Sequence, residues 1–403
     1  MRGHLVMSEK ERKRKSALDR VNRGELTLKT AAQVLGLSYR QCRRSYKRYR
    51  QEGDKGLVHR SRGRPSNHTK PASFRRKVLK RYANRYAPLD IGPTLAAEKL
   101  SEEGMQVHRE TLRRWTLEEG LRTKRCARAK HRSRREQKRH FGQLVQMDGS
   151  HHRWFGSEHD AACLMNMVDD ATKTTLACLR KQETTEAAMS CLWAWIERYG
   201  IPQALYTDKK NVFVTQREPT IEEQLAGQAP LTAFGKACAK LGIQIITAHS
   251  PQAKGRVERN HGVYQDRFLK ELALRGITTI ATANKLLQNG FTDGLNAKFS
   301  CPPLSEQDFH RPLPRGMDLA HVFCFEATRV VQRDWTISYD SRHYQISREN
   351  RILPKPKDKV IVRVLLDGAM HLLFRDKPLA FIRCPPPKAA PAHKGPHEHA
   401  ASH

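Results

Sequence analysis

The sequence has 403 residues, with 74 lysines and arginines against 41 acidic residues, and a formal charge of +33. This length predicts two to four domains. A mean hydropathy of −0.71 and the lack of an apolar run of about 18 residues exclude a chain built of membrane-spanning helices. The N-terminus shows no apolar signal-peptide segment, and the nine cysteines form no CxxC pair. We therefore expect no disulfide framework, no zinc ribbon and a reducing cytoplasmic setting.

The positive charge is concentrated near the start of the chain. Residues 1–140 carry a net charge of +26, residues 141–320 only +1, and residues 321–403 +6. A basic region attached to a nearly neutral body is typical of proteins that bind nucleic acid, because Lys and Arg displace the counterions condensed on phosphates. A merely solubilising basic tail is the alternative, but this region contains helix start and stop signals.

Residues 1–58 are predicted to form a first helix-turn-helix DNA-binding domain. Thr27 and Ser38 are suitable N-caps for two consecutive helices, and Gly36 separates these helices. The second helix, over residues 39–49, would enter the major groove of DNA. Its basic residues that we expect to contact DNA are Arg40, Arg43, Arg44 and Lys47. An ordinary basic helical hairpin is the alternative.

A basic linker is predicted over residues 59–71, and a second helix-turn-helix DNA-binding domain over residues 72–125. In the linker, Arg62 and Arg64 resemble arms that read the narrow minor groove of A·T-rich DNA, although a solvated linker explains them equally well. In the second domain, one helix ends at Gly104 and a basic helix follows over residues 108–115. Its candidate DNA-binding residues are Arg109, Arg113 and Arg114. Residues 126–140 form a basic connector.

The composition of the chain changes from strongly basic to nearly neutral at residue 141, and residues 141–310 are predicted to be an α/β core. Strands are expected over 143–148, 161–168, 174–179, 204–206 and 243–247, and helices over 183–198, 231–241 and 251–274. Three strands followed by alternating helices and strands predict a mixed sheet with helices on both faces. Short alternating segments predict a small antiparallel β-barrel over residues 320–384. The Pro-, Ala- and His-rich residues 385–403 are predicted to be disordered.

Three acidic residues of the core stand at the boundaries of predicted elements. Asp148 ends the first strand, Asp208 follows the fourth, and Glu258 lies on the long helix. Strands one and four can lie side by side and parallel, so both aspartates would meet at one edge of the sheet, and Glu258 could face that edge two turns after the helix begins. Clustered carboxylates need a cation to stay ionised, and hard oxygen ligands suit Mg²⁺ or Mn²⁺. Two such ions would support an in-line phosphoryl transfer.

The helix of Glu258 is also basic. Lys254 and His261 share the face of Glu258, and we expect Lys254 to contact the phosphate or base nearest the scissile bond. The predicted DNA-binding residues of this helix are Lys254, Arg256 and Arg259. A solvated basic helix is the alternative for each of them.

Other polar residues of the core are interpreted as structural. Asp169 and Asp170 compete as ligand candidates, but a hairpin turn explains them, and Asp266 is expected to pair within its own helix. His151 and His152 are interpreted as surface histidines at the edge of the sheet.

The segments around the three acids are QMDGSHHRWF, LYTDKKNVF and SPQAKGRVERNHGVYQDRFLKELALRGI. They resemble the catalytic-core motifs of bacterial insertion-sequence transposases of the ISNCY group, which share the retroviral-integrase core. GPTLAAEKLSEEG and HRETLRRW resemble a second helix-turn-helix region of that family. The resemblance covers residues 20–380. It implies a multidomain α/β protein with N-terminal helix-turn-helix units, a ribonuclease-H-like core and a C-terminal small β-barrel like that of Mu-type transposases.

By this resemblance, Asp148, Asp208 and Glu258 are the catalytic residues and the ligands of two Mg²⁺ or Mn²⁺ ions per active site. The sequence departs from integrases in one respect, because 49 residues separate the second and third acids, more than integrase cores usually have. The polar residues 217–230 are interpreted as an insertion. The HHCC zinc module of integrases has no counterpart in this sequence.

The resemblance implies a DNA transposase that binds terminal inverted repeats, cleaves the 3′ ends and transfers them to target DNA. We expect double-stranded DNA as partner, a homodimer or larger synaptic oligomer, and a place in the bacterial cytoplasm at the nucleoid. One rival is a DNA-binding regulator derived from a transposase with an inactive core. Another is a nuclease of RNA–DNA hybrids, which leaves the helix-turn-helix units unexplained. The terminal repeats, the target preference and the choice between copy-out and cut-and-paste pathways are not encoded in these patterns.

Overall fold

The structure, a computed structural model, describes residues 5–63, 69–123, 136–215, 217–219, 221–225, 227, 229–248 and 254–385. The chain forms two compact units, residues 1–83 and 84–403. Arg64, residues 126–135 of the predicted connector, the start of the predicted long helix at Pro251 and the tail after residue 385 lie outside the described residues. Among the described helices, none has the length and apolar character needed to cross a membrane.

The first unit is helical. It contains α1 (Glu9–Asn22), α2 (Leu28–Val34), α3 (Tyr39–Glu52), the 3₁₀ helix η1 (Gly53–Leu57) and α4 (Ala72–Arg81). The side chain of Thr27 caps α2 by accepting from the Thr30 N–H, and Ser38 forms a capping box with Gln41 at the start of α3. Gly36 turns the chain between them with a φ of 62°. The two predicted caps and the predicted glycine turn are therefore confirmed.

The second unit begins with short helices. The π-helical turn η2 (Tyr82–Tyr86) spans the boundary, and η3 (Ala87–Leu89), α5 (Pro93–Glu102) and α6 (Arg109–Glu118) follow. Gly104 turns the chain after α5 with a φ of 78°, and Leu100 and Leu112 are fully buried. Two helices around a glycine turn agree with the predicted second helix-turn-helix segment, whose domain limits stay a prediction.

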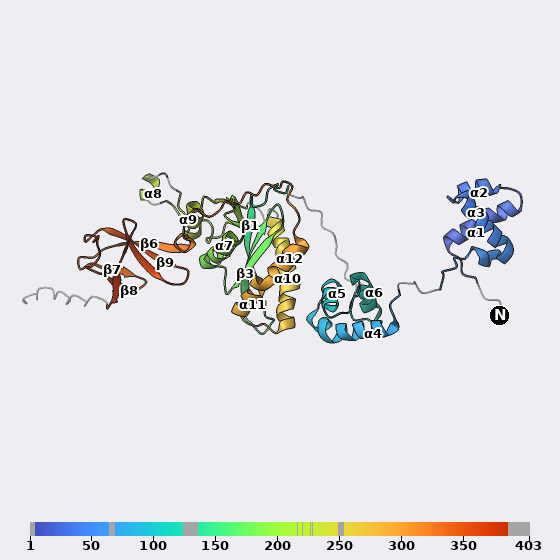
Figure 1. Cartoon of the computed structure of the whole chain (residues 1–403), viewed down its shortest axis with the longest axis horizontal. Helices are drawn as coiled ribbons and strands as arrows, with labels where there is room; N and C mark the ends of the chain where they lie inside the picture. Colours follow the sequence, from blue (N-terminus) through green and yellow to red (C-terminus); the bar gives the residue numbers. More distant parts are fainter. Residues whose placement is uncertain are drawn as a thin grey trace, which may run out of the picture. The chain divides into compact units, whose positions relative to one another are not determined.

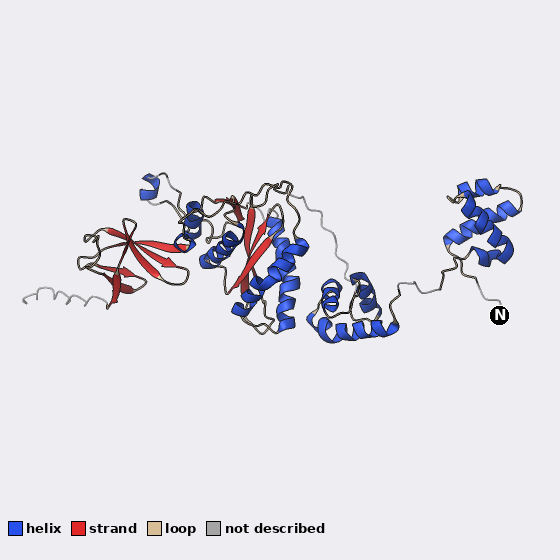
Figure 2. Ribbon diagram, viewed as in Figure 1, coloured by secondary structure: helices blue, strands red, loops and turns tan. Residues whose placement is uncertain are grey.

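A five-stranded mixed sheet forms the core of the second unit (Figure 2). Its strands are β1 (Val145–His152), β2 (Ala162–Asp169), β3 (Thr175–Arg180), β4 (Ala204–Thr207) and β5 (Gln244–Thr247), in the order β3-β2-β1-β4-β5. The first three strands form an antiparallel meander, and β4 lies parallel to β1 and to β5. The parallel pairing of the first and fourth strands is therefore confirmed.

Helices cover both faces of this sheet (Figure 1). They are α7 (Thr185–Tyr199), α9 (Ala233–Lys240), α10 (Gly255–Arg275), α11 (Ile280–Leu286), the π-helical turn η5 (Leu287–Phe291) and α12 (Thr292–Phe299). The short helix α8 (Ile221–Leu225) precedes α9, and its Ile221 and Leu225 side chains are exposed. The apolar cores show that α7 and α9 pack on one face and α10, α11 and α12 on the other. The strand order and the two helical layers agree with the ribonuclease-H-like core that the resemblance implied.

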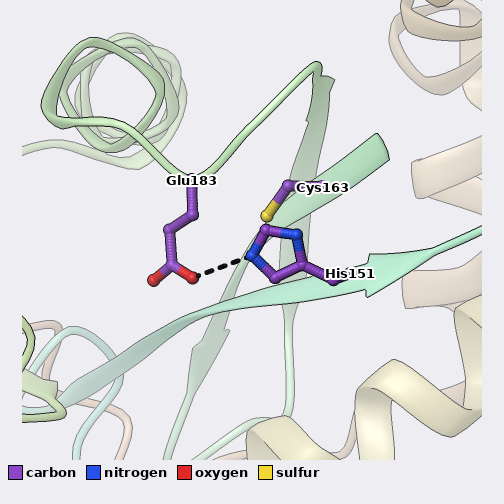
Figure 3. A group of neighbouring side chains, drawn as sticks. All are labelled: His151, Cys163 and Glu183. Atoms are coloured by element: carbon purple, nitrogen blue, oxygen red, sulfur yellow. Dashed lines mark ion pairs between the residues drawn. The ribbon is translucent and has the colours of Figure 1, made fainter. Parts of the chain in front are cut away.

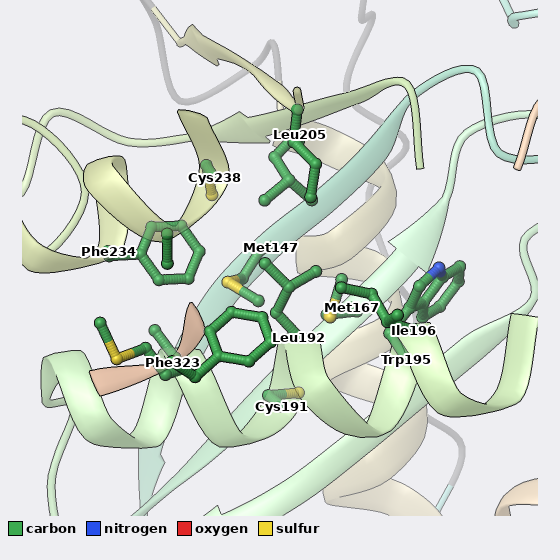
Figure 4. Packing of buried hydrophobic residues seen from close by; sticks show 14 of the residues in the cluster. Met147, Met167, Cys191, Leu192, Trp195, Ile196, Leu205, Phe234, Cys238 and Phe323 are labelled. Atoms are coloured by element: carbon green, nitrogen blue, oxygen red, sulfur yellow. The ribbon is translucent and has the colours of Figure 1, made fainter. Parts of the chain in front are cut away.

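The core on the α7 face fixes the sheet edge that carries the candidate site. Met147 of β1, Leu205 of β4 and Trp195 of α7 are fully buried and pack in one cluster (Figure 4). Burying a large apolar side chain contributes about 1.5–3 kcal/mol. Every residue of β2 is buried, because this strand lies inside the sheet and is covered on both faces.

Two features of the core differ from the sequence expectations. The first strand does not end at Asp148 but runs on to His152, because residues 149–152 pair with residues 162–165 of β2. The helices α11 and α12 were not predicted. Gly290, with a φ of 97°, interrupts the helical path between them and obscures the sequence periodicity.

After the core, a short helix α13 (Leu319–Val322) leads into an all-β region. Its strands are β6 (Cys324–Val330), β7 (Thr336–Tyr339), β8 (Arg342–Ile346), β9 (Lys359–Leu365), β10 (Met370–Phe374), β11 (Lys377–Leu379) and β12 (Phe381–Cys384). They form two sheets, of order β11-β10-β9-β6 and β12-β8-β7, around a shared apolar core. The predicted antiparallel β region is confirmed, and its closure into a barrel stays a prediction.

Candidate active site

The sheet topology brings two of the predicted acids together. The parallel pairing of β1 with β4 ends at the Gln146–Tyr206 pair, so Asp148 lies two residues beyond it, and Asp208 follows the end of β4 directly. Ligand oxygens of Asp148, Asp208 and Glu183 lie within 4.8 Å of one another. The sequence expectation that the two aspartates meet at one sheet edge is therefore met.

Glu183, the third member of this group, was not predicted. It lies between β3 and α7, directly before the N-cap residue Thr184, and its side chain is only 6% exposed. Strand β3 runs parallel to β1, because both are antiparallel to β2. The chain after β3 therefore leaves the sheet at the edge that carries Asp148. Strands β1, β3 and β4 run in the same direction, and each carries an acid within it or within three residues after it, which was the signal that could have revealed this residue.

Two lysine ammonium groups lie among the three carboxylates. The Nζ atom of Lys254 lies 3.0 Å from Asp148 Oδ1 and 3.5 Å from Asp208 Oδ2. The Nζ atom of Lys210 lies 2.7 Å from Glu183 Oε2 and 3.3 Å from Asp208 Oδ2. Because like charges this close repel unless cations separate them, the two lysines stabilise the ionised acids.

The electrostatics of Lys210 follow from these contacts. Burial opposes the charge of its ammonium group, but the hydrogen bond to Glu183 and the charges of Asp208 and Asp148 outweigh burial and raise the pKa of Lys210 to about 12. The lysine therefore stays protonated at every physiological pH. It provides a permanent positive charge at the edge of the acid group.

Glu258 is not part of the close group. It lies in the first turn of α10 and is exposed to solvent. Its neighbour on the same helix face does reach the site, because the Lys254 ammonium group contacts Asp148. Burial lowers the pKa of His261, against the attraction of the Asp148 charge. The role of Glu258 as a ligand stays a prediction.

A buried polar network fixes the start of α10 against the sheet. The backbone N–H of Val257 donates to Gln146 Oε1 at 3.2 Å, and Gln146 Nε2 donates to Asp170 Oδ1 at 2.9 Å. Arg256 pairs with the same fully buried carboxylate, at 2.7 Å. The Arg256 guanidinium, predicted to bind DNA, therefore has a structural partner. Asp169 accepts from the backbone N–H groups of three neighbouring residues, Gly142, Ala171 and Thr172, so both acids at the end of β2 are structural, as interpreted.

The remaining predicted DNA-binding residues differ in their surroundings. Those exposed to solvent on α3, α6 and α10 are Arg40, Arg43, Arg44, Lys47, Arg109, Arg113, Arg114 and Arg259. Two of them have partners in their own helix, Arg113 with Glu110 at 2.5 Å and Arg114 with Glu118 at 3.8 Å. Arg62 pairs with Glu11 at 2.5 Å. Their contacts with DNA stay predictions.

The donor chemistry of the acid group fits a divalent metal ion. Asp148, Asp208 and Glu183 supply carboxylate oxygens, the ligands that Mg²⁺ and Mn²⁺ prefer. The ammonium group of Lys254 lies against both aspartates, at the position of the positive charge that a metal ion would supply. The group therefore has the composition and charge of a site for a hard cation.

Comparisons with known proteins place the chain in a family. The helix-turn-helix domain family matches residues 13–66, which include most of α1 and all of α2 and α3. "Putative transposase y4bF" of Sinorhizobium fredii (strain NBRC 101917 / NGR234) is 38% identical over 354 residues, covering 87% of this chain and 75% of that protein. "Transposase for insertion sequence IS1202" of Streptococcus pneumoniae is 30% identical over 408 residues, covering 91% and 85%.

The chain belongs to the transposase family. The two matches span 87% and 91% of this transposase-family protein, so its relationship to them is not confined to a single domain. Its assignment to the ISNCY group stays a prediction.

The likeness to solved structures is weaker. A chain of the simian T-cell lymphotropic virus intasome in complex with PP2A regulatory subunit B56 gamma aligns over 72% of this chain and 96% of that chain, at 16% identity and a TM-score of 0.32. The catalytic core domain of HTLV-2 integrase in complex with magnesium aligns over 38% and 85%, at 20% identity and a TM-score of 0.28. TM-scores this low support no conclusion about the fold or the site.

Proposed function

We propose that the protein is a DNA transposase that binds the terminal inverted repeats of its element, cleaves their 3′ ends and joins these ends to target DNA. One observation carries this proposal. The carboxylates of Asp148 and Asp208, from adjacent parallel strands, converge on the ammonium group of Lys254 at 3.0 and 3.5 Å. Such a pair at a sheet edge, in a chain with transposase relatives, suits phosphoryl transfer on DNA.

In this proposal Asp148, Asp208 and Glu258 would hold two divalent ions, Mg²⁺ or Mn²⁺, which would activate a water or the 3′-hydroxyl of the DNA and stabilise the leaving oxygen. Lys254 leaves the aspartates and binds the phosphate nearest the scissile bond. Glu258 follows Lys254 by four residues, so in this proposal its carboxylate takes the place that the lysine leaves. Lys210 stays on Glu183 and keeps the outer edge of the site positive.

The basic helices bind the DNA ends in this proposal. Helix α3 enters the major groove of one segment of the terminal repeat, and α6 enters that of a second segment. Their exposed arginines and lysines neutralise phosphates, which accounts for the net charge of +26 on residues 1–140. Two ends must be joined, so the active form is a dimer or a larger assembly on double-stranded DNA. The region from β6 to β12 closes into a small barrel.

The test uses the DNA that flanks the reading frame. Duplexes carrying the inverted repeats that bracket it are incubated with the full chain and Mg²⁺, and nicking and strand transfer are measured on gels. Asp208→Asn is compared with Asp266→Asn, because Asp266 is an exposed acid that pairs with Lys270 on α10. Glu258→Gln is compared with Glu186→Gln, since both glutamates are exposed in the first turn of a helix.

We expect Asp208→Asn and Glu258→Gln to lose about 10²–10³-fold in cleavage rate, as charge-stabilising active-site groups do, while both controls keep wild-type rates. Equal nicking by Asp208→Asn and the wild type would contradict the proposal. If the wild type neither nicks nor joins ends, and Asp208→Asn still represses a promoter placed in the repeats, the protein is a DNA-binding regulator instead.

A further inference from the structure

A second group of potential ligands lies beside the acid group. His151 of β1 and Cys163 of β2 are directly opposite each other in the antiparallel register, so their side chains stand on the same face of the sheet. Glu183 approaches them from the segment between β3 and α7 (Figure 3). The sequence interpretation of His151 as a plain surface histidine leaves this convergence unexplained.

The geometry of the three residues is that of a compact cluster. One ligand atom of each, the His151 nitrogen, the Cys163 sulfur and a Glu183 oxygen, lies within 4.8 Å of the other two. The Nε2 atom of His151 lies 3.4 Å from Glu183 Oε2 (Figure 3). Cys163 is fully buried, whereas the side chain of His151 is 55% exposed and gives an ion access from solvent.

Two further observations show that the cluster is not satisfied by its own contacts. The buried Oε1 atom of Glu183 has no hydrogen-bond partner within the part of the chain that the structure describes. A buried carboxylate oxygen without a partner is costly. Gly149 lies over the same atoms, and a Cβ there would stand 2.7 Å from Glu183 Oε2 and 2.8 Å from Cys163 Sγ. Only glycine leaves these two ligand atoms uncovered.

The chemistry of the three donors differs from that of the acid group. A thiolate sulfur, an imidazole nitrogen and a carboxylate oxygen are the ligands that Zn²⁺ takes in proteins, whereas Mg²⁺ requires hard oxygen ligands. We propose that His151, Cys163 and Glu183 form a binding site for Zn²⁺ or a similar borderline cation, with a water as fourth ligand. On binding, the Cys163 thiol loses its proton to solvent and the sulfur bonds to the ion.

The inference does not rest on the proposed transposition chemistry, but it touches that site through one residue. Glu183 also holds Lys210 at 2.7 Å, and Lys210 lies 3.3 Å from Asp208. An ion that takes the Glu183 carboxylate competes with Lys210 for it. Occupancy of this site therefore changes the positive charge next to the catalytic aspartates.

The test measures metal binding by the full chain, without DNA. Metal-free protein is titrated with Co²⁺, whose bond to a thiolate gives a sulfur-to-metal charge-transfer band that oxygen and nitrogen ligands do not give. Zn²⁺ affinity is measured by competition with a chromophoric chelator. The variants are Cys163→Ser and His151→Ala. The matched controls are Cys238→Ser, a buried cysteine of α9, and His152→Ala, the next residue on the same strand.

We expect the charge-transfer band in the wild type and in both controls, and its loss in Cys163→Ser. His151→Ala should weaken Zn²⁺ binding by about tenfold or more, since even residues behind a metal ligand cost that much. Absence of the band in the wild type, or its persistence in Cys163→Ser, would overturn the proposal. If Cys163→Ser fails to fold by circular dichroism, His151→Ala decides, and unchanged Zn²⁺ affinity in that variant refutes the site.

Discussion

The Nζ atom of Lys254 lies 3.0 Å from Oδ1 of Asp148, and both side chains are largely buried, at 10% and 14% exposure. A lysine thus supplies the positive charge that two neighbouring aspartates require. The same lysine begins the helix that carries Glu258. Charge balance at the sheet edge and the placement of α10 are therefore linked through one residue.

The first prediction concerns this charge balance. Lys254→Met leaves Asp148, Asp208 and Glu183 with only the Lys210 ammonium among them. In the presence of EDTA we expect a loss of about 2 kcal/mol in the free energy of unfolding, below the cost of breaking a fully buried pair because Lys210 remains. Saturating Mg²⁺ should stabilise this variant more than the wild type, because the ion does not have to displace the Lys254 ammonium group from the aspartates.

Urea unfolding followed by tryptophan fluorescence measures this effect, since all five tryptophans lie in the second unit. Lys270→Met is the control, because Lys270 pairs with the exposed Asp266 along its own helix and should change stability by only about 0.5 kcal/mol. Equal stabilisation of wild type and Lys254→Met by Mg²⁺ would show that the ion binds elsewhere.

The second prediction separates two arginines of α10. Arg256 pairs with the fully buried Asp170, whereas Arg259 is exposed. Arg256→Gln should cost about 3 kcal/mol of unfolding free energy, because the buried Asp170 carboxylate loses this ion pair. Arg259→Gln should leave stability within about 0.5 kcal/mol of the wild type but weaken DNA binding and lower the salt slope by about 1. Urea unfolding measures the stability of the two variants, and fluorescence anisotropy at several salt concentrations measures their DNA binding. If Arg256→Gln lost DNA binding but kept wild-type stability, the structural role of Arg256 would be contradicted.

A third prediction addresses helix α3. Arg43 and Arg44 are exposed on this helix, and each replacement by Ala should lower the slope of log K against log salt by about 1 if that side chain neutralises one phosphate. Lys13→Ala is the control on α1, since its side chain is 70% exposed and pairs with Glu9 at 2.8 Å. Anisotropy titrations of terminal-repeat DNA provide the measurement. An equal loss for Lys13→Ala would mean that any exposed cation of this unit serves, and that α3 is not the recognition helix.

The fourth prediction is a pH dependence in the first unit. The Glu11 carboxylate accepts a hydrogen bond from the backbone N–H of Ser8 and further hydrogen bonds from His59 and Arg62. Together these hydrogen bonds lower the pKa of Glu11 from 4.5 to about 2, although burial opposes this shift. A lowered folded-state pKa stabilises the fold above the unfolded-state pKa, and this contribution is lost as the pH falls from about 4.5 toward 2. Glu11→Gln should therefore lower the melting temperature at neutral pH, measured by circular dichroism, and the difference from the wild type should shrink over that range. A difference that stays constant down to pH 2 would contradict it.

Local signals in the sequence were sufficient for the helical caps and for the order of the core. Ser38 acts through its contact with Gln41, three positions away, and Gly36 through its own positive φ, so their roles can be inferred without a fold. The convergence of Asp148 and Asp208 followed from topology, because parallel strands expose their carboxyl ends at the same edge.

The rest depends on tertiary contacts that no local pattern encodes. The partner of Arg256 is 86 residues away in the sequence, and it was therefore interpreted as a DNA contact. Glu183 lies in a polar loop where its burial is set by β1 and Lys210 rather than by its neighbours. The extension of β1 to His152 reflects pairing with β2, which the polar sequence after Asp148 does not suggest.

The central claim is that Asp148, Asp208 and Glu258 surround shared divalent ions, and iron-directed backbone cleavage tests it most directly. Fe²⁺ bound in place of Mg²⁺ generates hydroxyl radicals with ascorbate and peroxide, and these cut the chain close to the ion. The account predicts cuts near residues 148, 208 and 258 that excess Mg²⁺ suppresses together. Mg²⁺-sensitive cuts near 148 and 208 without any near 258 would contradict it and would leave Glu183 as the third carboxylate of the site.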